Sequence, residues 1–368
     1  MPGGTGYHRA APMTATLTNS PLGRTVAETA TDIWNDSCNV DELAYAVEFG
    51  AVGATANPTI VVDNWRTDPS GWATRTRVLA GENPTWSERE LAWAIVAEMS
   101  TRAAPLLMPA FAASGGRSGR LSIQTDPTLW RDADALVAQA QEFDGLAPNV
   151  VVKLPATRAG IAAMEEATYH GVSINATVSF SVAQAVAAAA AVERGLERRD
   201  AENRDTSRMG PVITIMMGRL EDWLREVADG DGLSIHPGAL PWAGVATVKR
   251  ALAEWQARGF RARLLAAAIR HHLHWSELIG GDLVLTMPSA WQKRFNASSV
   301  EVRSRIDDPV DPDHLAELRR LPDFVHAYEP DGLSIDEFDA WGPTRKTLRT
   351  FIGSYHDLLH LVTDALLA

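Results

Sequence analysis

Short apolar runs alternate with segments of helical spacing along most of the chain. Several runs, such as Val150–Leu154, are apolar at consecutive positions, which is typical of parallel strands that are covered on both faces. Segments such as Asp41–Phe49 and Ala159–His170 repeat apolar residues at helical spacing and end at a glycine. Eight runs are predicted strands: Thr31–Asn35, Val52–Ala56, Arg120–Thr125, Val150–Leu154, Ser173–Phe180, Val212–Met217, Arg263–Ala267 and Asp282–Met287.

Eight strand–helix units predict an α/β protein with a (β/α)8 TIM barrel, a fold that usually takes about 250 residues. The chain has 368 residues. The surplus falls after the second strand, at about 61–118, and at the C-terminus, at about 289–368. Both segments contain helical signals, so we expect extra helices there. A doubly wound open sheet shows the same alternation, and periodicity alone does not decide between the two folds.

The chain is predicted to form one domain over residues 21–368, because no long linker divides it. Residues 1–20 are small, polar and interrupted by glycine and proline, which predicts a flexible N-terminal arm. This arm lacks the apolar segment of a secretory signal. The longest apolar run, around Ala183–Val192, is too short to span a bilayer. We therefore expect a cytoplasmic protein without a membrane partner.

Acidic residues outnumber basic ones, with 46 Asp and Glu against 34 Lys and Arg and a net charge of −12. An acidic chain binds nucleic acid poorly through its overall field, so no nucleic-acid partner is expected. An anionic substrate must be held by a few local cations. The single cysteine, Cys38, excludes an internal disulfide and a cysteine-rich metal site.

Polar residues at the predicted strand ends are the candidates for chemistry, because active sites of barrels form at the carboxyl ends of the strands. Lys153 is unusual because it lies within an apolar run, where a charged amine is costly. Burial lowers the pKa of a lysine, and a neutral amine can attack a ketone to form a Schiff base. Alternatively, the side chain extends to solvent or pairs with a carboxylate. The candidates are Asp36, Asn57, Gln124, Lys153, Asn175, Thr177, Thr214, Arg219 and Arg270.

Five local sequences, taken in order along the chain, resemble the transaldolase family. They are Trp34–Ser37, Ala54–Ile60, Val151–Thr157, Gly171–Ser181 and Gly218–Trp223. Each motif is weak alone, but their order and spacing are specific as a set. The resemblance implies a (β/α)8 barrel that acts as a Schiff-base aldolase. Such an enzyme moves a dihydroxyacetone unit between sugar phosphates, as in pentose phosphate metabolism, and needs no cofactor.

The resemblance also implies which residues are catalytic. Lys153 would attack the C2 carbonyl of a ketose phosphate, and the resulting iminium would accept electrons. Asp36 would remove the proton of the C4 hydroxyl as the C3–C4 bond breaks. Without the resemblance, an aspartate at this place is more simply a turn or cap residue. Gln124 and Thr177 match two further positions that the resemblance implies are catalytic.

A second set of residues matches substrate-binding positions. Asn57 and Asn175 match asparagines that bind hydroxyl groups of the covalent intermediate, although asparagine at a strand end is also common in turns and caps. Arg219 and Arg270 match arginines that bind the substrate phosphate, a task for which the planar guanidinium is suited. Surface salt bridges are the alternative role for both arginines. Thr214 retains the hydroxyl of a family serine.

Besides Thr214, three positions depart from the family pattern. Gln124 stands where transaldolases usually carry a glutamate that acts through a water, and glutamine cannot accept a proton from that water at neutral pH. The related fructose-6-phosphate aldolases carry glutamine here. Those aldolases, however, use a tyrosine where this chain has Met216, a substrate-binding position that is usually phenylalanine in transaldolases. Ala268 replaces a serine beside the phosphate-binding arginine.

We therefore expect a transaldolase-like transferase that acts on small-molecule sugar phosphates. One alternative is a lyase that resembles fructose-6-phosphate aldolase and releases dihydroxyacetone, which Gln124 favours. Another is a catalytically impaired barrel that only binds sugar phosphates. Whether copies of the chain form a homo-oligomer is left open by the sequence.

Three histidines in the segment from His271 to His274 suggest an alternative metal-dependent mechanism, because imidazole is a common zinc ligand. The sequence offers no obvious carboxylate or cysteine partner for them, and helical geometry would direct neighbouring histidines apart. We therefore expect no metal.

Overall fold

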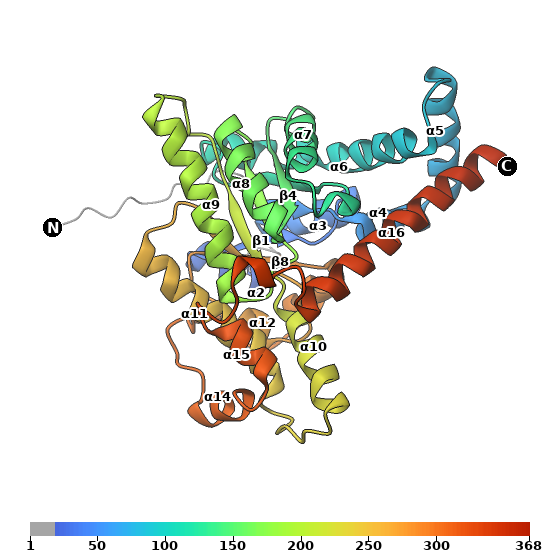
Figure 1. The fold of residues 1–368 in the computed structure, drawn as a ribbon. Coiled ribbons are helices and arrows are strands. Elements are labelled where there is room, and N and C mark those ends of the chain that lie inside the picture. The colour runs from blue at the N-terminus through green and yellow to red at the C-terminus, as the bar shows by residue number, and fades with distance from the viewer. Residues whose placement is uncertain (1–18) are drawn as a thin grey trace.

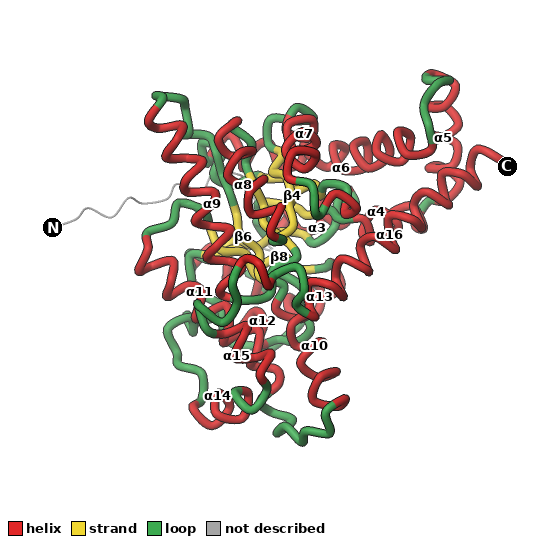
Figure 2. The backbone as a smooth tube through the Cα atoms, viewed as in Figure 1, coloured by secondary structure: helices red, strands yellow, loops and turns green. Residues whose placement is uncertain are grey.

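The computed structural model describes residues 19–368, and these residues form a closed barrel of eight parallel strands. Each strand pairs with the next along the chain, and the last strand pairs with the first. The strands, yellow in Figure 2, lie at the centre and are surrounded by helices. The predicted (β/α)8 TIM barrel is therefore confirmed, and an open sheet is excluded. The strands are β1 (Asp32–Asn35), β2 (Gly53–Thr55), β3 (Arg120–Gln124), β4 (Val150–Pro155), β5 (Ile174–Thr177), β6 (Val212–Ile215), β7 (Arg263–Ala266) and β8 (Leu283–Met287).

All eight predicted strands are present, and their ends differ from the predicted ends by three residues or fewer. The largest difference is in β5, which the sequence extends to Phe180 but which ends at Thr177. Val178 has a φ of 51° and so adopts the left-handed conformation, which interrupts the extended backbone. The apolar run continues through this break because Val178 and Phe180 are both buried.

Helices connect the strands and continue beyond the barrel. Between strands they are α3 (Val40–Glu48), α4 (Pro58–Thr67), α5 (Pro69–Glu82), α6 (Glu88–Ala113), α7 (Ala133–Asp144), α8 (Arg158–His170), α9 (Val182–Ala201), α10 (Met217–Gly230), α11 (Ala243–Arg258) and α12 (Leu273–Ser276). Before β1 lies α2 (Pro21–Glu28), and after β8 lie α13 (Ser289–Asn296), α14 (Pro312–Leu318), α15 (Pro322–Tyr328) and α16 (Gly342–Leu367).

Apolar side chains fill the barrel toward the amino ends of its strands. Trp34, Val151 and Val284 belong to one buried cluster there. Gly53 makes room for the indole, since an added Cβ would lie 2.3 Å from the ring of Trp34. Side chains two residues apart on a strand share a face. Lys153 therefore points into the same interior as Val151, one layer closer to the carboxyl end.

The helices between β2 and β3 pack with the last helix of the chain. The longest helix between β2 and β3, α6, begins at a capping box formed by Ser87 and Glu90. The long C-terminal helix α16, red in Figure 1, packs against α4, α5 and α6. The hydroxyl groups of Thr59 and Ser354 lie 2.9 Å apart between α4 and α16. The predicted helices after the second strand and in the C-terminal part of the chain are therefore both present.

The predicted N-terminal arm falls largely on residues 1–18, which lie outside the described residues. Ser20 already belongs to the folded part, because its hydroxyl accepts a hydrogen bond from the backbone N–H of Gly23 and caps α2. The division of the chain into domains stays a prediction. Within residues 19–368, no helix has both the length and the apolar character that crossing a membrane requires.

Candidate active site

A cavity of about 110 Å³ opens at the carboxyl ends of the barrel strands. It brings together polar side chains from seven strands or the segments that follow them, as the sequence predicts for a barrel. Asn175 and Gln124 are the two predicted site residues that do not line it. The other eight do: Asp36, Asn57, Lys153, Thr177, Thr214, Met216, Arg219 and Arg270.

Lys153 is buried on β4, where only 6% of the residue is exposed. Its Nζ donates a hydrogen bond to the backbone carbonyl of Ala56 at 3.3 Å. No carboxylate among residues 19–368 forms an ion pair with this amine, so neither of the alternative roles, extension to solvent or pairing, applies here. Burial lowers the pKa of Lys153 to about 8, the charge of Asp36 opposes the shift, and the charge of Arg219 adds to it. A useful fraction of the amine is therefore uncharged near neutral pH.

Asp36 follows β1 and is half-buried at the wall of the cavity. Its Oδ1 accepts a hydrogen bond of 2.5 Å from the hydroxyl of Thr55 on β2. That hydroxyl also lies 3.3 Å from the hydroxyl of Thr286 on β8. The side chain of Asp36 caps no helix, so the turn or cap role considered from sequence is not its role here. A free carboxylate oxygen can therefore face a substrate.

The two predicted asparagines differ in their surroundings. Asn57 caps α4, since its side-chain oxygen accepts from the backbone N–H of Ile60 at 3.0 Å, and it also lines the cavity. Asn175 is fully buried within β5. Its amide donates to the hydroxyl of Ser122 at 2.9 Å and accepts from the hydroxyl of Thr214 at 2.7 Å. Asn175 is thus neither a turn nor a cap residue, and it links three strands beneath the cavity.

Thr177 and Met216 face each other across β5 and β6. The hydroxyl of Thr177 lies 3.9 Å from the sulfur of Met216, and both residues are almost fully buried. A thioether sulfur is only a weak acceptor, so the hydroxyl remains available to a substrate or a water. Met216 supplies no proton.

Arg219 and Arg270 supply the cations of the cavity. Burial lowers the pKa of Arg219, and the positive charge of Arg270 lowers it further. The guanidinium of Arg219 lies over the ring of Phe351, 5.2 Å from its centre, and forms no ion pair within the described chain. Arg270 pairs with Asp222 at 2.9 Å. Two cations in one cavity, one of them without a paired carboxylate, form a site for an anion such as a phosphate group.

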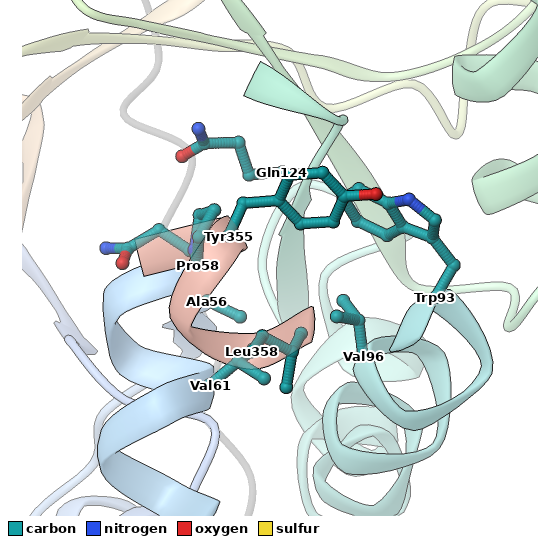
Figure 3. Close-up of a pocket in the computed structure, with 9 residues that line it drawn as sticks. Ala56, Pro58, Val61, Trp93, Val96, Gln124, Tyr355 and Leu358 are labelled. Carbon is teal, nitrogen blue, oxygen red and sulfur yellow. The ribbon is translucent and has the colours of Figure 1, made fainter. Parts of the chain in front are cut away.

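Gln124 lies next to Lys153 in the barrel register but lines a different, smaller cavity of about 10 Å³. The walls of that cavity come from α4, α6 and α16, and Figure 3 shows Tyr355 and Leu358 of α16 opposite Trp93 and Val96 of α6. The side-chain oxygen of Gln124 is buried without a hydrogen-bond partner. The catalytic role of Gln124 stays a prediction.

Thr55 and Thr286 are two site residues that the sequence analysis missed. Both line the cavity, and each is a hydroxyl residue in an otherwise apolar strand. Their inward position could have been found from strand alternation, because Thr55 is two residues from Gly53 on the same face. Tyr355 at the smaller cavity could not have been found in this way, because α16 is remote in sequence.

The expectation that the histidines have no carboxylate partner was wrong. Glu221, in the first turns of α10, lies between His271 and His274, and their ligand atoms all fall within 4.8 Å of one another. The sequence separates Glu221 from the histidines by about 50 residues, so only the fold could reveal the cluster. Cys38 is buried beside Asn64 and does not line the cavity that contains Lys153.

The chain matches a model of the family described as transaldolase/fructose-6-phosphate aldolase over residues 33–358. It is 28% identical over 365 residues to a protein named transaldolase from Parafrankia sp., covering 86% of this chain and 92% of the relative. It is 29% identical over 263 residues to a transaldolase 2 from Streptomyces avermitilis, covering 65% of this chain and 69% of the relative.

A third relative, a transaldolase from Thiobacillus denitrificans, is 28% identical over 295 residues, which cover 73% of this chain and 81% of the relative. The family model spans the barrel strands and most of α16. The predicted resemblance is thereby confirmed, together with the predicted class of enzyme, one that transfers aldehyde or ketone groups. The chain belongs to the transaldolase/fructose-6-phosphate aldolase family.

Proposed function

We propose that this protein is a transaldolase that transfers a dihydroxyacetone unit from a ketose phosphate to an aldose phosphate through a Schiff base on Lys153. The observation that carries the proposal is the burial of this amine, which lowers its pKa to about 8, in a cavity that also holds a carboxylate and two arginines. The names of the relatives support the same reaction.

The reaction begins when the uncharged Nζ of Lys153 attacks the C2 carbonyl of the ketose. The carbinolamine that forms loses water and becomes an iminium. Asp36 then removes the proton of the C4 hydroxyl, the C3–C4 bond breaks, and its electron pair enters the iminium to give an enamine. The aldose phosphate leaves, an acceptor aldehyde takes its place, and the same steps run in reverse.

The remaining residues bind and orient the sugar. Arg219 and Arg270 hold the phosphate, which fixes the distance of the reacting carbons from Lys153. Asn57 and Thr214 offer hydrogen bonds to hydroxyl groups of the sugar, and the hydroxyl of Thr177 can hold the water that leaves the carbinolamine. Asn175 acts from below the cavity through its hydrogen bond with Thr214.

A second candidate function is cleavage without transfer, which releases dihydroxyacetone. Gln124 favours this alternative because it matches the aldolase branch of the family, whereas Met216 favours transfer. The two reactions share the Schiff base and differ only in what removes the three-carbon unit from Lys153, an acceptor aldehyde or water.

Borohydride trapping tests the proposal. The protein is incubated with fructose 6-phosphate, reduced with borohydride and weighed by mass spectrometry. A three-carbon adduct is expected, because reduction makes the bond to Lys153 permanent. Addition of erythrose 4-phosphate before reduction should remove most of the adduct if the enzyme transfers the unit. An unmodified protein would reject the Schiff base, and an adduct unaffected by the acceptor would favour simple cleavage.

A further inference from the structure

The two arginines of the cavity come from separate segments of the chain. Arg219 lies in the first turn of α10, and Arg270 follows β7. The two guanidinium groups repel each other, as the effect of Arg270 on the pKa of Arg219 indicates. When no phosphate is bound, other contacts have to hold these two segments at the spacing that a phosphate needs.

Backbone contact between the two segments is unusually close. An added Cβ at Gly218, the residue before Arg219, would lie 1.9 Å from the carbonyl oxygen of Ala268 and 2.7 Å from the Cγ of Arg270. Ala268 itself has a φ of 66°, a left-handed conformation that is strained for a residue with a side chain. Such strain persists only where surrounding contacts maintain it.

Glu221 provides contacts between the segments from a buried position. Only 1% of this residue is exposed, and it lies two positions after Arg219 on α10. Its Oε1 lies 2.7 Å from the Nε2 of His274, and its Oε2 lies 2.9 Å from the Nε2 of His271. Burial raises the pKa of Glu221, but the hydrogen bonds from both histidines outweigh burial and bring the pKa below its usual value. The group is therefore a carboxylate.

His274 carries the connection on to Arg270. The backbone N–H of Arg270 donates to the Nδ1 of His274 at 3.1 Å. Because Nδ1 accepts, the proton of the neutral imidazole is on Nε2, which donates to Glu221. A continuous chain of hydrogen bonds thus runs from the backbone of Arg270 through His274 to the helix that carries Arg219.

This arrangement disfavours a metal ion among Glu221, His271 and His274. A metal ligand at the Nε2 of His274 would require a proton on Nδ1, and that proton would face the N–H of Arg270. In the observed arrangement, the carboxylate instead accepts both Nε2–H groups. Within the cluster, the Nδ1 of His271 is the ring nitrogen that is buried without a hydrogen-bond partner.

We propose that Glu221 is a positioning residue for phosphate binding, acting through His271 and His274 to hold the Arg270 segment against α10. The inference rests on the proposed function, in which both arginines bind the substrate phosphate. Glu221 touches neither the substrate nor the reacting atoms. Its effect is to place two mutually repelling cations at a fixed separation before the anion arrives, which lowers the cost of ordering them on binding.

The test compares E221Q with wild type and with the matched control E226Q, an exposed change of the same kind on the same helix. Titration calorimetry with inorganic phosphate measures the anion site, and borohydride trapping with unphosphorylated dihydroxyacetone measures the Schiff base independently. We expect the dissociation constant for phosphate to rise about tenfold in E221Q, because small misplacements weaken a bidentate site. The amount of dihydroxyacetone trapped on E221Q should equal that on the wild type. The dissociation constant of E226Q for phosphate should also equal that of the wild type.

Two further measurements keep the test decisive if E221Q folds poorly. In H271A, which alters a half-buried residue, we expect about a threefold loss of phosphate affinity, since one of the two connections remains. Wild-type phosphate affinity in every variant that folds would overturn the inference. Stabilisation of the wild type by Zn²⁺ that E221Q loses would also overturn it, by identifying a metal site. Absence of a dihydroxyacetone adduct in the wild type would reject the proposed function alone.

Discussion

The two sides of the cavity are built on opposite principles. On the lysine side, Lys153 is buried without a carboxylate partner among the described residues, and its nearest polar contact is the neutral carbonyl of Ala56. On the arginine side, two guanidinium groups are held among two carboxylates, Glu221 and Asp222, and two imidazoles. Burial of an unpaired amine sets the first side, whereas the second side combines a buried Arg219 with an Arg270 that is paired with Asp222.

This difference indicates which property each side supplies to the reaction. A nucleophile needs a lone pair, so its positive charge has to be disfavoured, and desolvation does this without any partner. An anion site needs its positive charge retained, and at Arg270 the paired carboxylate of Asp222 stabilises that charge. Changes on the lysine side should therefore affect bond making, whereas changes on the arginine side should affect affinity for phosphate.

The largest effect is expected from K153M, which removes the nucleophile but retains an apolar side chain of similar length. Transfer activity and the borohydride adduct should both be lost. The fold should be retained, because the change removes a buried amine rather than a packed apolar group. Mass spectrometry and thermal unfolding measure the two outcomes, and K293M, at an exposed lysine, is the control. Turnover in K153M above the background would contradict the assignment of Lys153.

The same variant makes the stability of the protein depend differently on pH. The pKa of Lys153 is about 8 in the folded protein and 10.5 when unperturbed. Between these values the unfolded chain binds a proton that the folded protein does not, so the contribution of Lys153 to the free energy of unfolding rises with pH in this window. Relative to K153M, the wild type should therefore gain stability from pH 8 to 10.5. A constant difference across this range would contradict the lowered pKa.

A smaller effect is expected from D36N, also on the lysine side. Loss of the base should lower the rate of transfer by about 10²- to 10⁴-fold. The adduct with dihydroxyacetone should still form at neutral pH, because the charge of Asp36 raises the pKa of Lys153 and its removal favours the uncharged amine. Steady-state kinetics and trapping measure the two effects, with D63N on α4 as an exposed control. If the rate of transfer and the formation of the dihydroxyacetone adduct fell by the same factor, Asp36 would be needed for Schiff-base formation itself.

On the arginine side, R219Q should raise the KM for a ketose phosphate by about 10- to 100-fold, as expected for the loss of a charged hydrogen bond of about 1.5–3 kcal/mol. Trapping of unphosphorylated dihydroxyacetone should persist, but its pH dependence should shift upward, because Arg219 helps to lower the pKa of Lys153. R225Q, an exposed change on the same helix, is the control. A loss of kcat with unchanged KM would place Arg219 in bond making instead.

The smallest effect is expected from Q124E, which restores the residue that transaldolases usually carry. Adduct formation should become faster by about tenfold at most, since burial raises the pKa of the new carboxyl group and leaves part of it protonated at neutral pH. Stopped-flow or quenched trapping measures this rate, with Q124M as the variant of similar size. Unchanged rates in Q124E would indicate that this position does not take part in the loss of water.

The barrel and most of the lysine side could be predicted from sequence because their signals are local. Each strand is a short apolar run, and Lys153 interrupts one of these runs. The end of β5 was missed because a left-handed valine, Val178, leaves no mark in a pattern of apolar residues. The inward position of Thr55 was available from strand alternation but was overlooked.

The arginine side and the smaller cavity could be predicted only in part, because they depend on contacts between distant segments. Glu221 meets His271 and His274 only when α10 packs against the turn after β7. The smaller cavity beside Gln124 exists because Tyr355 and Leu358 of α16 cover it. These two residues lie more than 200 positions after Gln124 in the sequence. No local pattern contains that information.

The rate of adduct formation on Lys153 as a function of pH is the most direct measurement. The chain has four lysines, so peptide mapping after borohydride reduction identifies which one carries the dihydroxyacetone unit. A single modified site at Lys153 is expected, with a rate that rises with pH and levels off above about 8. Modification at another lysine, or a rate at Lys153 that continues to rise toward pH 10.5, would contradict a buried amine that is poised to form a Schiff base.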